Sequence, residues 1–452
     1  MRRSIVTTLC LAAALCAAQA RAAALSESAK REVITKAAAA LADGYVYPDL
    51  GRKAGAAIQK NLDQGAYASI ADKSAFAFRL TDDLQGTTHD KHMRVINTDG
   101  PPPPAGSDLA PPPRSRGGFI RVDRLKGDIG YIALSGFPSP GLFKDAADDA
   151  MKAVAGTDAL IIDMRQNGGG SPEAVAYLCS FFFDPARPTH LNDLVWRDRG
   201  TETFHTDSFS TVPVPTHYLG KPVILITSHF TFSGGEEFTN DLKTQKRAVV
   251  VGETTGGGAN PGGVRPVGSG LLLFVPGGRA VNPITKTSRE GVGVLPDLAT
   301  TPEAAFAAAY KAALDAAKPS KARAQVKLRL AASGGEVEAW TEASLQTART
   351  VPIPGAEAAL RAIIADAASG KPNYAAMTPD FIKSAQDQFS VAHTDVVALG
   401  ALKSVAFERV DMLGADVYRT DFERGALEWT FYVNAQGKVA VAFYRKLPGG
   451  PT

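Results

Sequence analysis

One stretch, residues 222–238, constrains the fold of this chain more than any other. Val223 to Ile226 is a continuous apolar run rich in β-branched residues, which is typical of a buried strand. Ser233-Gly234-Gly235 interrupts that pattern, and residues 236–242 have the composition of the first turns of a helix. A serine on a tight strand-to-helix turn exposes its hydroxyl, and the N–H groups after it can face a developing oxyanion. The alternative is a glycine-rich connection in an α/β sheet that contains a serine by chance.

The rest of the chain divides into segments that differ in composition and in hydrophobic pattern. Its 452 residues exceed what one hydrophobic core usually holds. Strand and helix patterns alternate between Gly118 and Ala317, which favours a largely parallel, covered sheet, because parallel neighbours need crossover connections. We expect a signal peptide at 1–22, a helical domain at 23–97, a proline-rich linker at 98–117, an α/β core at 118–318, a connector at 319–355 and an α+β domain at 356–452.

Hydrophobic periodicity predicts the individual elements of these segments. The predicted helices are 28–42, 50–62, 73–84, 142–154, 172–183, 236–242, 302–317, 356–367 and 378–389. The predicted strands are 119–122, 129–134, 159–164, 223–226, 248–251, 271–275, 404–410, 416–421, 427–433 and 439–444, with a hairpin turn at 434–437.

The N-terminus has the form of a secretory signal peptide. Arg2 and Arg3 precede an apolar run from Ile5 to Ala18, and the small residues from Ala20 to Ala23 offer a cleavage site. We therefore expect an exported protein, periplasmic or secreted, with no membrane anchor after cleavage; a retained anchor is the alternative. Cys179 is then the one remaining cysteine, so no intramolecular disulfide forms, and its apolar surroundings predict a core position.

The composition argues against several classes of partner. The net charge of +3 is too small to indicate binding to nucleic acid or to a membrane surface. The seven histidines do not fall into metal-ligand spacings, so no metal site is expected. No Gly-Lys-Ser/Thr follows the glycine clusters, so no phosphate-binding loop is expected either. We expect no cofactor.

Four motifs in a fixed order resemble the S41 family of serine peptidases, which includes the C-terminal processing proteases, the tricorn core protease and the repeats of interphotoreceptor retinoid-binding protein. The motifs are residues 163–170, 231–236, 252–257 and 290–297, within a resemblance that covers roughly residues 27–317. The resemblance implies an α/β core of the ClpP/crotonase type and a peptide or protein substrate. The C-terminal segment resembles the α+β folds of the nuclear-transport-factor type, and the segment 97–117 leaves no room for the PDZ domain of many members.

The subtype follows from a missing lysine. The family's processing proteases use a Ser-Lys dyad, with the lysine in the glycine-rich turn after the next strand. Here that turn holds Gly256 to Gly258 and no lysine, and we expect Lys243 and Lys246 to face solvent. A serine without a base is a poor nucleophile at neutral pH, so a histidine is required.

His92 is the histidine that the resemblance selects. The run Asp90-Lys91-His92 resembles the Asp-x-His motif where tricorn-like and retinoid-binding-protein-like members place their general base. His89 and His229 are the alternatives. By the same resemblance Glu290 orients the imidazole; the alternative for Glu290 is a surface carboxylate.

The implied oxyanion hole combines the N–H of Gly234 with that of Gly168 or Gly169, since glycine permits close approach of a carbonyl. Asp163 and Arg165 are expected to brace that glycine loop. Glu236 is expected to be a first-turn carboxylate favoured by the helix dipole.

The sequence leaves two classes of function open, an enzyme and a non-catalytic binding protein. The leading hypothesis is an exported serine endopeptidase that forms an acyl-enzyme on Ser233. The alternatives are a non-catalytic protein that binds lipids or other apolar ligands on the same fold, and an esterase that uses the same three residues.

Overall fold

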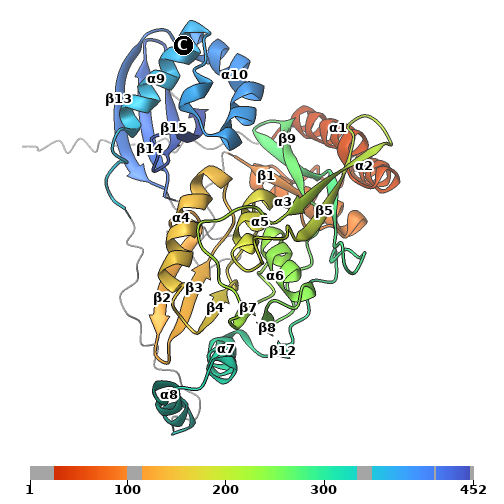
Figure 1. Cartoon of the computed structure of the whole chain (residues 1–452). Coiled ribbons are helices and arrows are strands. Elements are labelled where there is room, and N and C mark those ends of the chain that lie inside the picture. The colour runs from red at the N-terminus through yellow and green to blue at the C-terminus, as the bar shows by residue number, and fades with distance from the viewer. Residues whose placement is uncertain (1–24, 99–114, 333–348, 412–413, 448–452) are drawn as a thin grey trace, which may run out of the picture.

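The structure, a computed structural model, describes residues 25–98, 115–332, 349–411 and 414–447. The predicted signal peptide at 1–22 and most of the predicted linker at 98–117 lie outside the described residues. The described part consists of a central α/β module, a helical N-terminal lobe and a C-terminal α+β lobe (Figure 1).

A six-stranded sheet forms the centre of the molecule, in the order β12-β8-β7-β4-β3-β2. Neighbouring strands run parallel except for the antiparallel pair of β2 and β3, so the expected largely parallel sheet is confirmed. The strands are β2 (Phe119–Leu125), β3 (Ile129–Leu134), β4 (Ala159–Asp163), β7 (Val223–Thr227), β8 (Val249–Gly252) and β12 (Leu298–Ala299).

Helices cover both faces of this sheet. On one face, α4 (Pro140–Val154), α5 (Pro172–Ser180) and α6 (Gly234–Thr244) pack against alternate strand residues such as Leu160 and Ile162. On the other face, α7 (Pro302–Ala316) packs against the residues between them, such as Ile161. Because both faces are covered, β4 and β7 are buried along their whole length, which explains their unbroken apolar runs.

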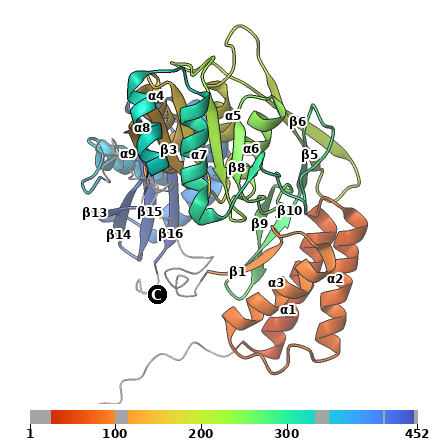
Figure 2. The same cartoon turned by 90° about the horizontal axis from the view of Figure 1, so that it is seen from below.

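The N-terminal lobe shares its core with a second sheet. The helices α1 (Glu27–Gly44), α2 (Pro48–Asp63) and α3 (Lys73–Thr88) confirm the three predicted helices. They pack on an antiparallel sheet of β1 (Arg94–Asn97), β10 (Leu271–Pro276) and β9 (Gly262–Gly268), as Figure 2 shows. The buried residues of the helices and of this sheet form one cluster. The strand predicted at 271–275 therefore exists, but it lies outside the parallel sheet.

Several strands of the described chain were not predicted. A third sheet contains β5 (His190–Arg197), β6 (Phe204–Ser210) and β11 (Gly278–Val281) in the order β11-β5-β6. Strand β6 is mostly exposed and polar, so its sequence carries no hydrophobic alternation and its pairing with β5 supplies the structure. Within the predicted connector at 319–355, residues Lys321–Ala332 form α8.

The C-terminal lobe confirms the predicted pattern of helices and strands. Helices α9 (Ala356–Ser369) and α10 (Pro379–Leu399) cover an antiparallel meander of β13 (Leu402–Val410), β14 (Asp416–Phe422), β15 (Gly425–Val433) and β16 (Val439–Lys446). A turn at Asn434–Gly437 joins the last two strands, as predicted. The lobe is seated on α4, where Lys144 pairs with Asp380 at 2.7 Å and Gly141 lies against Ala440.

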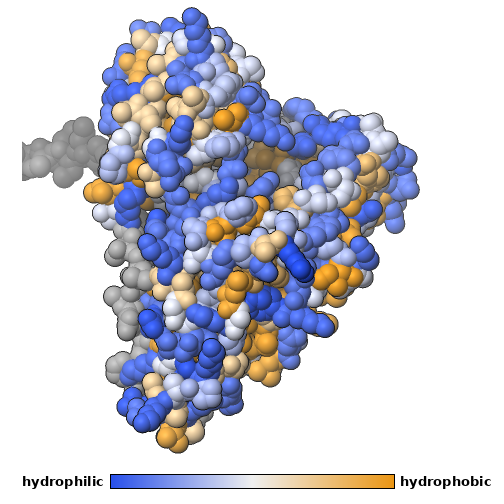
Figure 3. All heavy atoms as spheres, in the orientation of Figure 1, coloured by the Kyte–Doolittle hydropathy of each residue, from blue (hydrophilic) through white to orange (hydrophobic). Residues whose placement is uncertain are grey.

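The outer surface is largely hydrophilic on the face that Figure 3 draws, and that face is hollowed between the C-terminal lobe and the N-terminal helices (Figure 3). None of the described helices combines the length and the apolarity that crossing a membrane requires.

Candidate active site

Ser233 lies on a strained turn between β7 and α6. It is the N-cap residue of α6, and its backbone has φ 53° and ψ −120°. A positive φ is uncommon for a residue with a Cβ, and such strain persists only where the surroundings hold it in place. The predicted strand-to-helix turn is present, with the half-buried serine at its apex.

Glu236 holds this turn from inside the protein. Its carboxylate is completely buried, and it accepts the N–H of Ser233 at 2.9 Å and those of Gly257 and Gly258 at 2.7 Å each. It also accepts the hydroxyl of Thr255. The expectation of a simple first-turn carboxylate was therefore incomplete, because the fold encloses this side chain between the Ser233 turn and the glycine-rich turn after β8.

Arg289 connects the same turn to the loop that carries Glu290. Its guanidinium donates to Glu237 at 2.6 Å and to the carbonyl of Ser233 at 3.2 Å. The ion pair is buried, with 9% and 7% of the two side chains exposed. Through this contact the Glu290 loop is placed beside the Ser233 turn.

The loop of Gly168 to Gly170 packs directly against the serine. A Cβ on Gly169, whose φ is +97°, would lie 2.6 Å from both the N atom of Gly234 and the Cβ of Ser233. The N–H of Gly168 donates to the carbonyl of Ser135 at 3.2 Å, and that of Gly169 donates to the Asn167 side chain at 2.9 Å. Within the described chain the N–H of Gly234 has no acceptor, so it is free to serve a ligand.

His92 lies between α3 and β1 with only 5% of its surface exposed. Its ring packs against Phe232, the residue before Ser233, at a centroid distance of 4.5 Å, and against Phe274 at 5.8 Å. Burial, followed by the charges of Arg94 and Arg289, lowers the pKa of His92 to about 3, so the imidazole is neutral at pH 7.

Both ring nitrogens of His92 lack a hydrogen-bond partner among the described residues. The structure therefore brings His92 to the residue next to Ser233, but the two side chains form no hydrogen bond with each other.

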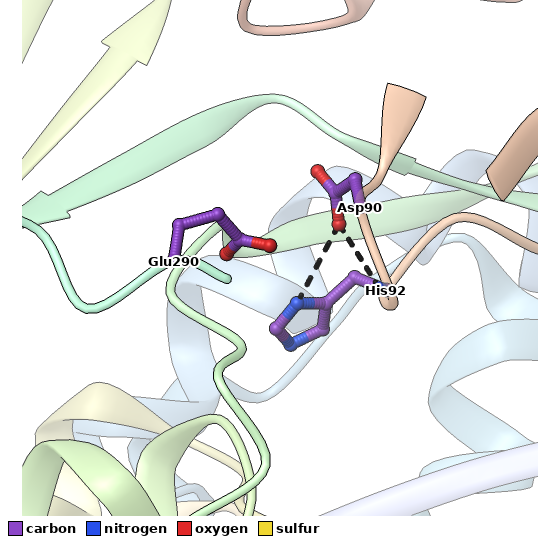
Figure 4. A group of neighbouring side chains, drawn as sticks. All are labelled: Asp90, His92 and Glu290. Atoms are coloured by element: carbon purple, nitrogen blue, oxygen red, sulfur yellow. Dashed lines mark hydrogen bonds and ion pairs between the residues drawn. The ribbon is translucent and has the colours of Figure 1, made fainter. Parts of the chain in front are cut away.

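Two carboxylates flank the imidazole (Figure 4). Nδ1 of His92 lies 3.9 Å from Asp90 Oδ1, and one ligand atom each from Asp90, His92 and Glu290 lies within 4.8 Å of the others. The structure thus places Glu290 near His92. Sequence reasoning gave Asp90 no role of its own, although the Asp-x-His spacing was a usable signal.

The carboxylates differ in their partners. Asp90 accepts the N–H of His92 at 3.0 Å, the hydroxyl of Tyr45 at 3.2 Å and the amide of Asn260 at 2.9 Å. Glu290 accepts the N–H of Ala259 through one oxygen, and its other oxygen is buried without a partner in the described chain. Burial, followed by the charge of Asp90, raises the pKa of Glu290 to about 7.

The alternative histidines lie in solvent. His89 is exposed at the left-handed end of α3, and the exposed ring of His229 pairs with Glu253 at 2.9 Å. Lys246 is exposed as expected, whereas Lys243 is partly buried and pairs with Asp297 at 2.7 Å.

The remaining expectations concern the structural residues around the site. Asp163 and Arg165 pair at 2.6 Å, and Arg165 also donates to the carbonyl of Pro302 at 2.8 Å. These contacts hold the end of β4 against the start of α7, and the expected bracing of the glycine loop stays a prediction. Cys179 is completely buried in the core, as predicted.

Two family models match this chain. The model described as peptidase family S41 matches residues 128–300. The model described as the N-terminal domain of Peptidase S41 in eukaryotic IRBP matches residues 13–114. Together the two models cover more than half of the chain.

Individual relatives are more distant. The chloroplastic carboxyl-terminal-processing peptidase 2 of Arabidopsis thaliana is 30% identical over 173 residues, which are 37% of this chain and 31% of that protein. The chain thus matches about a third of the length of that curated relative.

Among solved structures, a candidate peptidase from Parabacteroides merdae has 18% identity and a TM-score of 0.45, covering 69% of this chain and 99% of that one. The photosystem II D1 C-terminal processing protease has 16% identity and a TM-score of 0.42, covering 61% and 94%.

Proposed function

Because this chain belongs to peptidase family S41, we propose that it is a serine endopeptidase that cleaves peptide bonds through an acyl-enzyme on Ser233. The observation that carries the proposal is the strained backbone of Ser233, with a buried, neutral histidine packed against the preceding residue. Strain of this kind at the tip of a strand-to-helix turn exposes a nucleophile. Glu236 and Arg289 hold it there.

His92 is the general base in this mechanism. Its free ring nitrogen takes the proton of the Ser233 hydroxyl as Oγ attacks the substrate carbonyl, and the imidazolium then returns that proton to the leaving amine. Water hydrolyses the acyl-enzyme by the same route. Since the low pKa of His92 reflects a buried site that disfavours the charged ring, the imidazolium needs nearby negative charge. Glu290 supplies that charge, with Asp90 beside it.

The base has to close onto the nucleophile for this step. In the structure the His92 nitrogens have no partner, so no hydrogen bond must break before the ring turns toward Ser233. Catalytic hydrogen bonds are often unformed without substrate and tighten in the complex. We propose that a peptide bound over the Ser233 turn brings the two groups together.

The oxyanion hole is centred on the N–H of Gly234. This group lacks an acceptor in the described chain and stands at the N-terminus of α6, where the helix dipole favours negative charge. The second donor is proposed to be Gly168 or Gly169. Each of these N–H groups is engaged with Ser135 or Asn167, so it must exchange that partner for the oxyanion.

One experiment tests the proposal directly. Ser233→Ala should abolish cleavage of a broad peptide library and labelling by a fluorophosphonate, and mass spectrometry of the labelled wild type should map the probe to Ser233. Ser74→Ala, an exposed serine on α3, is the matched control and should label and cleave normally. Wild-type protein that neither labels nor cleaves would contradict the proposal, and ester turnover without peptide cleavage would favour an esterase.

A second candidate function is favoured by a pocket in the C-terminal lobe. The pocket has a volume of about 460 Å³, lies between the helices and the sheet of that lobe, and is lined mainly by apolar residues including Phe381, Trp429 and Tyr444. A pocket of this size and character suits a small apolar ligand. Lipid found by native mass spectrometry, together with an unreactive Ser233, would favour a binding protein.

Export and the finer fold assignments are part of the same proposal. The basic residues Arg2 and Arg3 before the apolar run support export to the periplasm or the medium. N-terminal sequencing of the secreted protein should begin near Ala20 to Ala23. The helix-covered parallel sheet supports a core of the ClpP/crotonase type, and the helices on a four-stranded meander support a C-terminal domain of the nuclear-transport-factor type.

A further inference from the structure

We propose that Asp90, His92 and Glu290 form a binding site for a divalent transition-metal ion, represented by Zn²⁺, and that the bound ion switches the peptidase off. The metal site itself stands on the geometry of the three side chains. The inhibitory effect rests on the proposed function, because it assumes that His92 is the general base.

The first argument is convergence. The three residues come from two segments separated by about two hundred positions, and one donor atom of each lies within 4.8 Å of the others. Figure 4 shows a ring nitrogen of His92 directed at the carboxylate of Asp90, with the carboxylate of Glu290 beside it. The distance from Nδ1 to Asp90 Oδ1 is 3.9 Å, so a modest contraction brings these atoms to the spacing found around one metal ion.

The second argument is unsatisfied polar atoms. Both nitrogens of His92 and Oε1 of Glu290 are buried and have no hydrogen-bond partner among the described residues. His92 is 5% exposed, so solvent reaches little of it. Buried polar groups are rarely left without a partner, and an orphaned one costs free energy. A cation held between these atoms would satisfy the ring and the carboxylate at once.

The third argument is charge. No described lysine or arginine forms an ion pair with Asp90 or Glu290. Arg289, although adjacent in sequence to Glu290, pairs with Glu237, and Lys91 donates to the carbonyl of Gly256. Besides burial, the charges of Arg94 and Arg289 reach this site and lower the pKa of His92, but in the described chain neither arginine forms an ion pair with Asp90 or Glu290. A divalent cation between the carboxylates would supply the paired counter-ion that they lack.

The donor set decides the class of ion. One imidazole nitrogen and two carboxylate oxygens suit Zn²⁺ and similar ions, which accept nitrogen and oxygen ligands and leave a further position for water. Tyr45 and Asn260 donate to Oδ2 of Asp90, so they fix the carboxylate and leave Oδ1 turned toward the ring. Outer hydrogen bonds of this kind orient metal ligands. The sequence offers no ligand spacing here because Glu290 is distant in the chain.

Inhibition follows from the chemistry of imidazole. A neutral ring that binds a metal through Nδ1 carries its proton on Nε2. Neither nitrogen then has a free lone pair, so the ring cannot accept the Ser233 proton. Removing the metal restores the base.

The binding test uses the full chain carrying Ser233→Ala, so that self-cleavage and catalysis play no part. After chelator treatment, zinc titration by calorimetry should show one tight equivalent. Asp90→Asn and Glu290→Gln should each weaken it at least tenfold. His229→Gln is the matched control, because it removes an exposed histidine–carboxylate pair, and it should leave that equivalent in place. Circular dichroism checks that each variant is folded. Equal zinc affinity in Asp90→Asn, Glu290→Gln and the parent would overturn the proposal.

The inhibition test uses the wild-type protein. Zinc at the concentration that saturates the site should abolish peptide cleavage, and EDTA should restore it. Full cleavage by zinc-saturated enzyme would overturn the inhibitory part. If the chelated enzyme cleaves nothing, the peptidase proposal fails instead, and the calorimetry on the Ser233→Ala protein still decides whether the metal site exists.

Discussion

Replacement of Glu236 by glutamine should disable this protein although the two side chains have the same shape. The carboxylate of Glu236 is completely buried and accepts two donors on each oxygen: the N–H groups of Ser233 and Gly258 on one, and the Thr255 hydroxyl and the Gly257 N–H on the other. Glutamine keeps one oxygen and replaces the other by an NH₂ group. Whichever way the amide turns, it presents a donor to at least one backbone N–H.

The magnitude follows from these contacts. In the less costly orientation the NH₂ faces Thr255, whose hydroxyl can rotate, and the N–H of Gly257 loses its acceptor. An orphaned buried donor costs about 1–3 kcal/mol, and the change from charged to neutral acceptor weakens the two bonds that remain by about 1 kcal/mol in total. We expect a loss of about 2–4 kcal/mol in the free energy of unfolding. Because the N–H of Ser233 loses a charged anchor, we also expect kcat to fall about 100-fold, as for a nucleophile displaced by about 1 Å.

The assay is urea unfolding followed by circular dichroism, with Ser233→Ala as the common background, and peptide cleavage in the active protein. Glu303→Gln makes the same chemical change at an exposed first-turn position of α7, and it should alter stability by less than about 0.5 kcal/mol. If Glu236→Gln costs no more than this control and keeps the wild-type rate, the claim that Glu236 holds the Ser233 turn is refuted.

Three further predictions concern the glycine loop and the charges of Glu290 and His92. Gly169→Ala should destabilise the protein by more than about 2 kcal/mol and abolish cleavage, because its Cβ would lie 2.6 Å from Gly234 N at a φ of +97°. Gly168→Ala is the control and should be tolerated, because no atom lies within 4 Å of its Cβ. Equal tolerance of both variants in thermal melts would contradict the packing argument. In chelator-treated protein, the folded pKa of Glu290, about 7, lies above its ordinary value, so its contribution to stability is present at low pH and is lost as the pH rises toward 7. Between about pH 5 and about pH 8, the free energy of unfolding of Glu290→Gln should therefore increase relative to that of the wild type by up to about 2 kcal/mol. The pKa of His92 is lowered to about 3, so its contribution is present above about pH 6.5 and lost as the pH falls; a His92→Gln variant whose stability falls as steeply in acid as the wild type would refute this.

Most elements of the central module and the C-terminal lobe could be predicted from local patterns. Strands such as Val223–Thr227 are buried on both faces and have apolar residues throughout. In amphipathic helices such as Pro48–Asp63, the buried residues recur every three to four positions. Strand Phe204–Ser210 could not be predicted in this way, because its exposed polar residues are held by pairing with β5 and not by burial. Its conformation is a property of its neighbours.

Local patterns in the sequence were sufficient to predict most helices, the strands of the C-terminal lobe and the strands of the central sheet other than β12. They also identified the serine between a strand and a helix and the motif that contains His92. These follow from short-range periodicity and from residues that are adjacent in the chain. Three arrangements could be seen only in the folded chain: Asp90 and Glu290 flank one imidazole, Glu236 is enclosed by four donors, and the strand at 271–276 pairs with the segment after His92. These contacts join residues that can be far apart in the chain, and chain packing, which no local pattern records, places them together.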